Sequence, residues 1–327
     1  MSNFQEMAIA RAINAGLRKK LAENRKVLMF GEDVAQLGGV FRVTEGLHKE
    51  FGDAQVFNSP IAESGIVGTA IGLAMRGYRS VCEIQFDGFI FPAFDQITTQ
   101  LAKMANRSEG FHKMPIVIRV PYGGGIGAVE HHSESPEAYF AHTPGLRVVS
   151  PSNPNDAYWM IQQAIDSDDP VMFFEPKRRY WQKGPVNLDT PPMPLHSARV
   201  LHEGNQVTIA TYGPMVTVAL QAAQIAAEEG VSLEVVDLRS LSPIDFTTIV
   251  NSVKKTGRLV VASEAPNFVS VASEVAARVG EQAFYHLQAP VLRVGGFDIP
   301  YPAAKLEEVF LPDADRILEA VDRVLAY

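Results

Sequence analysis

Short apolar runs alternate with helical segments along the whole length of this 327-residue chain. Val27–Phe30 and Ile116–Val120 are typical of buried strands, and Glu63–Met75 between them is typical of a helix. Strands that are apolar on both faces and are joined by helical crossovers form a parallel sheet covered by helices on each side. The sequence therefore predicts an α/β fold built in three layers.

This alternation is interrupted once, by a proline-rich segment. Four prolines, at positions 185, 191, 192 and 194, fall within ten residues. Proline removes a backbone donor and stiffens the chain, so the segment is typical of a rigid linker. We therefore expect a first domain over residues 1–184, a linker over 185–196 and a second parallel-sheet domain over 197–327.

The charge balance restricts the possible partners. Lysine and arginine number 29 and aspartate and glutamate number 37, so the formal net charge is −8. Because phosphate backbones and anionic membranes select basic surfaces, we expect no nucleic acid and no membrane as ligand. A basic protein partner is compatible with this charge.

No segment is predicted to cross a membrane or to form a disulfide. The longest uncharged apolar stretch, Gly65–Met75, has 11 residues, and a membrane span needs about 20. The pattern over Phe4–Leu21 predicts an amphipathic helix of the folded domain rather than a targeting peptide. The single cysteine, Cys82, excludes an internal disulfide and is predicted to be buried. We therefore expect a bacterial cytoplasmic protein.

One carboxylate, Glu63, opens the helix predicted over Glu63–Met75. Gly65, Gly68 and Gly72 leave one side of that helix nearly bare, which favours a tight protein interface. The carboxylate itself has two interpretations: it stabilises the helix N-terminus, or it acts as a catalytic acid/base beside an apolar wall.

A glycine loop follows the strand Ile116–Val120. Its pattern Gly123-x-Gly125-x-x-Ala128 fits a nicotinamide dinucleotide fingerprint, but such a loop must open directly into a long helix. Pro136 arrives within about a dozen positions, which favours a mobile glycine loop instead.

Two adjacent histidines, His131 and His132, end this loop. Neighbouring side chains diverge in a strand or a helix, so the pair is not expected to share a metal ion. A histidine that faces a cleft is a candidate acid/base, because imidazole titrates near neutrality. The pattern alone leaves this role open to either residue.

Four phenylalanines between Phe86 and Phe94 end another predicted strand. They are typical of a core, although Phe89 could also stack on a flat heterocycle at the carboxyl end of the sheet. The run Lys177–Tyr180 is either an anion site or a basic cluster that is solvated or lies at an interface. The sequence has no phosphate loop or serine nucleophile elbow, and it lacks the GDG…Asn signature with which thiamine diphosphate enzymes bind magnesium and diphosphate.

A series of motifs resembles the beta subunit of the thiamine-dependent first component of 2-oxo acid dehydrogenase complexes, which is related to transketolase. The motifs run in order over about residues 25–327 and are Phe30–Val34, Gly38–Leu47, Ser59–Glu63, Glu83–Phe86, His131–Ser133, Pro144–Val149, Val236–Leu241 and Gly296–Pro302. The resemblance implies a transketolase-like pyrimidine-binding domain followed by a transketolase C-terminal-like domain. It also explains the missing diphosphate signature, because an alpha subunit holds diphosphate and magnesium in this family.

The resemblance implies a role for four residues. Glu63 would hydrogen-bond the ring nitrogen of the aminopyrimidine of thiamine diphosphate and activate the cofactor. Phe89 would pack on the pyrimidine, with Gln85 beside it. His132 would lie at the mouth of the site and serve acyl transfer to the lipoyl group of the second component, and His131 would be a spectator.

The resemblance further implies an α2β2 heterotetramer that docks a dihydrolipoyl acyltransferase through its peripheral subunit-binding module. It implies a structural potassium site made mainly of backbone carbonyls. The residues that match this site are Ile116, Ala164, Ile165, Ser167 and Asp169.

The stretches His132–His142 and Phe173–Arg178 resemble branched-chain members more than pyruvate members, so we expect branched-chain 2-oxo acids as substrates. A pyruvate or acetoin dehydrogenase beta subunit is the alternative. Two hypotheses of other classes are a non-catalytic partner of the alpha subunit and a nicotinamide-dependent dehydrogenase.

Overall fold

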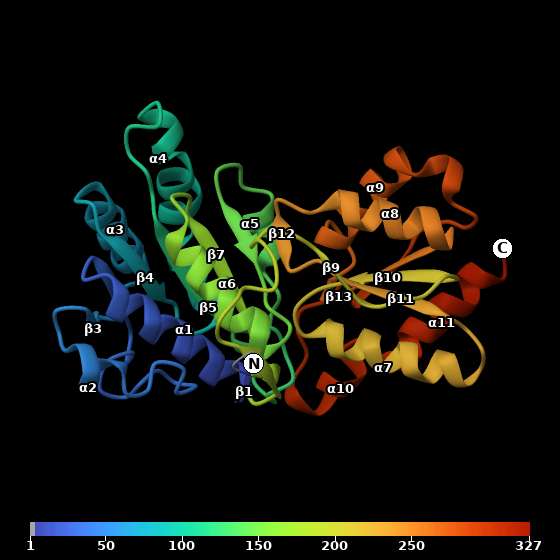
Figure 1. Ribbon diagram of the computed structural model, residues 1–327, viewed down its shortest axis with the longest axis horizontal. Coiled ribbons are helices and arrows are strands. Elements are labelled where there is room, and N and C mark those ends of the chain that lie inside the picture. Colours follow the sequence, from blue (N-terminus) through green and yellow to red (C-terminus); the bar gives the residue numbers. More distant parts are fainter. Residues whose placement is uncertain (1–3) are drawn as a thin grey trace.

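The computed structural model describes residues 4–327, which form two α/β domains that lie side by side (Figure 1). The first domain has a seven-stranded sheet in the order β12-β6-β7-β5-β4-β2-β3. Its strands are β2 (Val27–Gly31), β3 (Val56–Asn58), β4 (Arg79–Glu83), β5 (Ile116–Tyr122), β6 (Arg147–Val149), β7 (Val171–Pro176) and β12 (Ser240–Ser242). All pairs among β2–β7 are parallel, as the continuously apolar runs predict.

Helices cover both faces of this sheet because side chains alternate along each strand. In β2, Val27 and Met29 pack in the core formed with α1 (Ile9–Glu23) and α6 (Pro154–Asp166). Leu28 and Phe30 point to the opposite core. The elements on that side are α3 (Glu63–Met75), the turn η1 (Asp87–Ala93), the π-helix η2 (Gln96–Leu101), α4 (Ala102–Arg107) and α5 (Glu137–Ala141).

The second domain has a five-stranded sheet in the order β14-β13-β10-β11-β9. Its elements are β9 (Arg199–His202), β10 (Val207–Thr211), α7 (Met215–Glu228), β11 (Leu233–Asp237), α8 (Phe246–Thr256), β13 (Leu259–Pro266), α9 (Val271–Gln282), β14 (Leu292–Gly296) and α11 (Ala314–Leu325). Helices α7 and α11 pack on one face, and α8 and α9 cover the other. The predicted α/β class and the two-domain, three-layer architecture are therefore confirmed.

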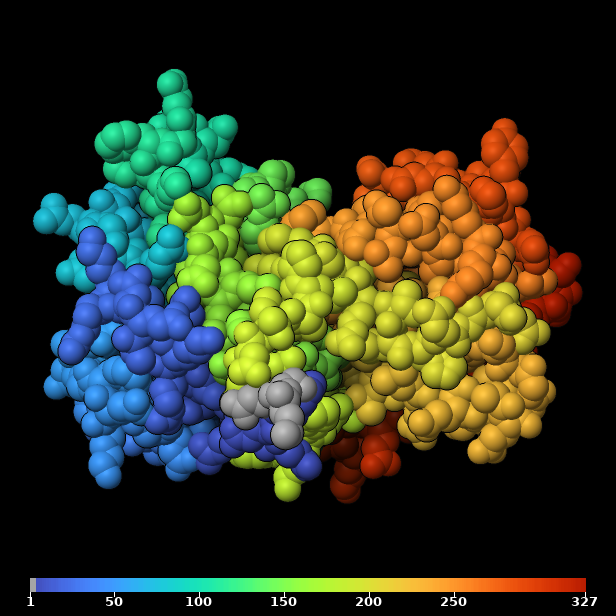
Figure 2. Space-filling view, in the orientation of Figure 1, coloured from blue at the N-terminus to red at the C-terminus, as the bar shows by residue number. Residues whose placement is uncertain are grey.

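The sheets are mixed rather than purely parallel. Strand β9 runs antiparallel to β11, and β12 runs antiparallel to β6. Strand β12 lies after β11 in the sequence but completes the sheet of the first domain, so the two domains share backbone pairing. Figure 2 shows the two lobes in continuous contact over this face, with a notch between them at the upper edge.

The first helix begins later than expected, and a strand occupies the start of the proline-rich segment. Residues Phe4–Ala8 form strand β1, and the first helix begins only at Ile9. Strand β1 pairs antiparallel with β8 (Lys183–Asn187), which takes up the first residues of the predicted linker. This pairing joins segments almost 180 residues apart, so a tertiary contact overrides the local helical pattern.

The remaining elements are short. They are α2 (Leu47–Phe51), η3 (Glu130–His132), η4 (Lys177–Arg179), η5 (Phe284–His286), η6 (Ala304–Leu306) and α10 (Glu307–Phe310). Residues 92–107 are divided between η1, η2 and α4, with Pro92 inside the η1 turn. Within residues 4–327, no helix combines the length and the apolar character that a membrane crossing requires. Cys82 is fully buried, as predicted.

Candidate functional site

The predicted site residues lie at the carboxyl ends of neighbouring parallel strands in the first domain. Glu32 follows β2, Gln85 follows β4, and the loop that ends at His132 follows β5. Glu63 is the first residue of α3, which comes after β3. The carboxyl edge of an open α/β sheet is where ligands bind, because the loops there converge.

Glu63 and Glu32 form the acidic part of this edge. The carboxylate of the half-buried Glu63 makes no hydrogen bond or ion pair to any residue between 4 and 327, and the N-terminus of α3 has no side-chain cap. Glu32 is 6% exposed, and its Oε1 is buried without a hydrogen-bond partner. Burial, then the negative charges of Glu63, Asp33 and Glu83, raise the pKa of Glu32. The raised pKa favours a proton on Glu32 beside Glu63. The oxygens of both carboxyl groups that lack a hydrogen-bond partner are available to a ligand.

Phe86, Phe89 and His132 form the aromatic part. The His132 ring stacks on Phe86 with centroids 4.0 Å apart, and Phe89 meets the same imidazole edge-on at 5.1 Å. Nδ1 of His132 is buried without a hydrogen-bond partner. His131 is exposed, so the structure separates the two histidines as one inward and one outward residue.

The structure brings only some of the predicted residues into direct contact. Nε2 of Gln85 lies 3.3 Å from Oδ2 of Asp33, which places the amide beside the Glu32–Asp33 turn. Phe89 contacts His132. In the part of the chain that the structure describes, no hydrogen bond or ring contact joins Glu63 to Phe89 or His132.

A cluster of buried charged side chains lies in the strands β4, β5 and β7 that lead to this edge. The guanidinium of Arg119 donates to Glu83 at 2.5 Å and to both oxygens of Glu175 at 2.7 and 2.9 Å. The hydroxyl of Tyr180 donates to Glu175 at 2.5 Å. The sequence carries one signal for this cluster, since Arg119 interrupts an otherwise apolar strand; in the structure Arg119 lies in register with Glu83 of β4. The corresponding signal for Glu32 is its place directly after the buried strand β2.

The basic run Lys177–Arg179 is an interface cluster rather than an open anion site. Nζ of Lys177 lies 2.6 Å from Oδ1 of Asp87, and both side chains are fully buried. Arg178 pairs with Glu264 of the second domain at 2.7 Å. The guanidinium of Arg179 donates to the carbonyl of Pro214. All three cations are therefore used inside the protein.

Two of the five residues predicted for potassium contact the same arginine. The guanidinium of Arg79 donates to the carbonyl oxygens of Ile165 at 3.0 Å and Ser167 at 2.9 Å. A carbonyl oxygen has two lone pairs, so these two groups can still accept a second cation. Over residues 4–327 there is no cluster of three or more histidine, cysteine or carboxylate side chains that could hold a metal.

The glycine loop lacks the helix that a dinucleotide fingerprint requires. It ends in η3, a turn of three residues, and the next helix, α5, has only five. The nicotinamide hypothesis is therefore not supported by the local fold.

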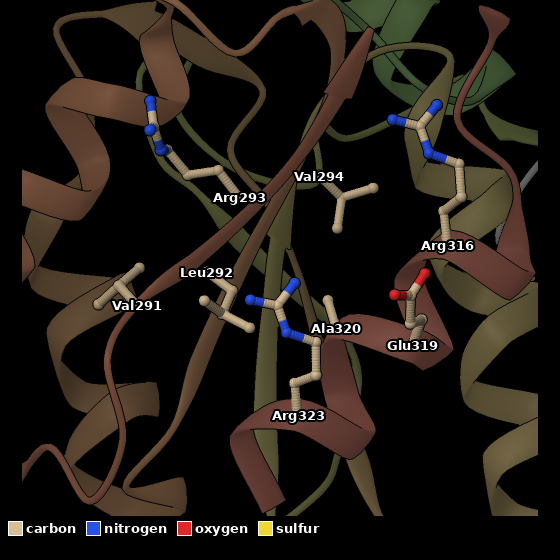
Figure 3. A pocket seen from close by; sticks show the side chains of 8 residues that line it. All are labelled: Val291, Leu292, Arg293, Val294, Arg316, Glu319, Ala320 and Arg323. Atoms are coloured by element: carbon tan, nitrogen blue, oxygen red, sulfur yellow. The ribbon is translucent and has the colours of Figure 1, made fainter. Parts of the chain in front are cut away.

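Two cavities are notable. The larger, of about 340 Å³, lies at the edge of the second sheet, and Figure 3 shows Arg316 and Arg323 of α11 beside Leu292 and Val294 of β14. Its residues belong to the second domain, away from Glu63. The smaller cavity, of about 140 Å³, lies at the domain junction, and the first residue of its lining, Ser133, comes directly after His132 in the chain. It is lined by Ser133, Glu134, Ser135, Pro136, Tyr139, Glu264, Pro266, Ile299, Tyr301 and Phe310.

Comparison with known proteins identifies both domains. Residues 5–182 match the family model of the transketolase pyrimidine-binding domain, and residues 196–317 match that of the transketolase C-terminal domain. A solved structure described as a split gene transketolase, inactive beta4 tetramer, superposes with a TM-score of 0.80 at 26% identity and covers 98% of each chain.

Two curated relatives cover nearly the whole chain. The pyruvate dehydrogenase E1 component subunit beta of Leifsonia xyli is 68% identical over 99% of this chain and 96% of its own length. The 3-methyl-2-oxobutanoate dehydrogenase subunit beta of Mycobacterium tuberculosis is 52% identical over 98% of this chain and 92% of its own length. With its transketolase pyrimidine-binding and C-terminal domains, the chain belongs to the family of E1 beta subunits of 2-oxo acid dehydrogenases.

Proposed function

We propose that this chain supplies the aminopyrimidine half of a split thiamine diphosphate site and is active only with an alpha subunit in an α2β2 heterotetramer. The observation that carries the proposal is the pair of carboxyl groups at the sheet edge. Glu63 has no hydrogen-bond partner in the described chain, and Glu32 beside it has a buried oxygen without one. Buried polar atoms are normally paired, so these oxygens fit a missing polar ligand.

The residues at this edge fit an aminopyrimidine. Glu63 would share a proton with a ring nitrogen, and Glu32, whose pKa is raised by burial, would place a second carboxyl group close to it. Phe89 and Gln85 would bound the ring, one by packing and one by its amide. When bound, thiamine diphosphate supplies the carbanion chemistry that decarboxylation of a 2-oxo acid requires.

His132 would act in the second half of the reaction. Its stacked, half-buried imidazole has one unpartnered nitrogen and is held at a fixed place beside Phe89. An imidazole there can give a proton to a lipoyl sulfur when the acyl group is transferred. His131, which is exposed, would take no part in this step.

The bare side of α3 would receive a partner subunit. Within the described chain, a methyl group placed on Gly68 or Gly72 would meet no atom within 4 Å. Ile61, just before the helix, is 84% exposed. An alpha subunit would contribute magnesium and the diphosphate site, and a potassium ion would share the carbonyls of Ile165 and Ser167 with Arg79.

The substrate belongs to the same proposal. We expect branched-chain 2-oxo acids from the stretches around His132 and Phe173, and the relative named for 3-methyl-2-oxobutanoate agrees with this choice. The higher identity of the relative named for pyruvate makes pyruvate the second candidate. The acidic second domain would dock the subunit-binding module of a dihydrolipoyl acyltransferase, and the bacterial origin of the relatives fits a cytoplasmic location.

Reconstitution tests the proposal. The chain alone should neither reduce a dye with 2-oxo acids nor bind thiamine diphosphate tightly, and co-expression with its alpha partner should produce both properties. Profiling with pyruvate and the three branched-chain 2-oxo acids then ranks the substrates. Crosslinking of a reactive pyrimidine analogue only to the alpha subunit would contradict the split site and favour a non-catalytic partner.

A further inference from the structure

The glycine loop that leads to His132 is held by the second domain. The loop follows β5, and His132 lies five residues after Gly127. The backbone N–H groups of Gly125 and Gly127 donate to the two carboxylate oxygens of Glu307, at 2.8 and 2.9 Å. Glu307 is the first residue of α10, in the second domain. One carboxylate of that domain therefore binds two donors of a first-domain loop.

Two further contacts bring the domains close at the same place. The N–H of Gly124 donates to Glu264, which also pairs with Arg178. The hydroxyl of Tyr301 donates to Glu307 at 2.7 Å. A Cβ on Gly124 would lie 1.8 Å from the Tyr301 hydroxyl oxygen, so this close approach requires glycine. The glycine run is thus explained by the packing of the second domain on the loop.

The other end of the loop is anchored inside the first domain. The N–H of Gly123 donates to the carbonyl of Glu134 at 2.9 Å. The N–H of Glu134 donates to Oδ2 of Asp87 at 2.8 Å, and Asp87 is paired with the buried Lys177. In the sequence, His132 lies between the glycines that Glu307 binds and the anchored Glu134, two residues before Glu134.

We propose that Glu307 and Tyr301 are positioning residues for His132, so that the second domain takes part in acyl transfer as well as in assembly. The inference rests on the role proposed above for His132. Burial acts to raise the pKa of Glu307, but the hydrogen bonds from Tyr301, Gly125 and Gly127 outweigh it and lower the pKa below its ordinary value. The ionised carboxylate accepts all of these bonds, and it fixes the loop on which the imidazole depends.

The variants Glu307→Gln and Tyr301→Phe test this in the α2β2 protein. The amide of Glu307→Gln replaces one acceptor oxygen by a donor that faces another donor, and Tyr301→Phe removes one bond without changing the packing. The neighbouring Glu308 is exposed, and Glu308→Gln is the matched control. Hydrogen–deuterium exchange of a peptide covering residues 123–134 should accelerate at least about tenfold in Glu307→Gln and stay unchanged in the control.

Activity measurements then distinguish a positioning role of Glu307 from a general loss of stability. We expect Glu307→Gln to slow acyl transfer to a free lipoyl domain about tenfold or more, with dye reduction within about twofold of the parent, and Tyr301→Phe to lie between. In a His132→Ala background, Glu307→Gln should cause no further loss of acyl transfer, because the two residues act as a unit.

Three outcomes would overturn the inference: unchanged loop exchange in Glu307→Gln, equal losses in both assays, or a full additional loss in the His132→Ala background. If Glu307→Gln does not assemble, Tyr301→Phe gives the same comparison. A His132→Ala variant with normal acyl transfer would instead overturn the role of His132 itself, so the two failures are distinguishable.

Discussion

The imidazole of His132 stacks on the ring of Phe86 with centroids 4.0 Å apart and an interplanar angle of 13°. The contact joins the end of the glycine loop to the segment that follows β4. It holds a titratable ring at a fixed place although Nδ1 has no hydrogen-bond partner. An imidazole ring held at a fixed place is suited to transferring a proton to a substrate.

Substitution of Phe86 tests this stacking. Phe86→Leu keeps an apolar side chain but removes the aromatic face, so we expect acyl transfer to a lipoyl domain to fall about tenfold and dye reduction to change less. Phe111, which is 83% exposed, provides the control variant Phe111→Leu. Acyl transfer at the parent rate in Phe86→Leu would show that the stack does not matter.

A buried carboxyl group makes the domain junction sensitive to pH. Burial raises the pKa of Glu137 to about 7, although the hydroxyl of Tyr212 in the second domain donates to its Oε1 at 2.5 Å. The folded protein therefore binds a proton that the unfolded chain releases near pH 4.5, and this stabilisation is lost as the pH rises to about 7. Burial and the nearby Asp156 raise the pKa of Asp237 to about 7, which acts in the same direction.

We expect the free energy of unfolding to fall with rising pH between about 4.5 and 7, by up to about 1.4 kcal/mol per pH unit for each group. Glu137→Gln imitates the protonated carboxyl group and should roughly halve this slope in thermal unfolding at a series of pH values. Glu308→Gln should leave it unchanged. A Glu137→Gln protein with the parent slope would contradict the assignment.

The buried pair of Asp87 and Lys177 should be costly to break. Both side chains are fully buried, and Lys177→Met would leave the Asp87 carboxylate without its cation. We expect a loss of about 3–5 kcal/mol in the free energy of unfolding, measured with denaturant. Lys177→Met combined with Asp87→Asn should recover part of it, and Lys49→Met at an exposed position should change little. A loss below about 1 kcal/mol would mean that water reaches the pair.

Helix α3 should bind its partner through the bare glycine face. A Cβ at Gly68 meets no atom within 4 Å in the described chain, so we expect Gly68→Leu to fold with a thermal midpoint close to the parent value. It should fail to form the heterotetramer in sedimentation velocity. Gly280→Leu, at an equally open glycine of α9, is the control for the cost of the substitution itself. Normal assembly of Gly68→Leu would remove this face from the interface.

Local patterns predicted most of the fold, because they depend on neighbouring residues. Helix α3 has the bounds predicted from the sequence, Glu63–Met75, and strand β2 is only one residue longer than the predicted strand Val27–Phe30, because a nearly continuous apolar run marks each segment. Strand β1 was missed because its pairing with β8 lies far away in sequence. The same reason hid the antiparallel β12, which joins the sheet of the other domain.

The candidate site also combines residues that local patterns indicate with contacts between distant parts of the sequence. Glu63 stood out as the only carboxylate of a small-residue helix, and the resemblance to beta subunits gave it a role. The contact of Glu307 with Gly125 joins residues 182 positions apart, and no local pattern carries a signal for it. The raised pKa of Glu32 likewise depends on burial and on the charges of Glu63, in helix α3, and Glu83, in strand β4, which lie far from Glu32 in the sequence.

Glu63 is the group of this chain that is proposed to activate the cofactor. The direct measurement is dye-coupled decarboxylation by the α2β2 protein carrying Glu63→Gln, with the assembly state checked in the same sample. Because the amide cannot exchange the proton, we expect kcat to fall at least about 100-fold while the tetramer still forms. A Glu63→Gln tetramer with the kcat of the parent protein would contradict the account.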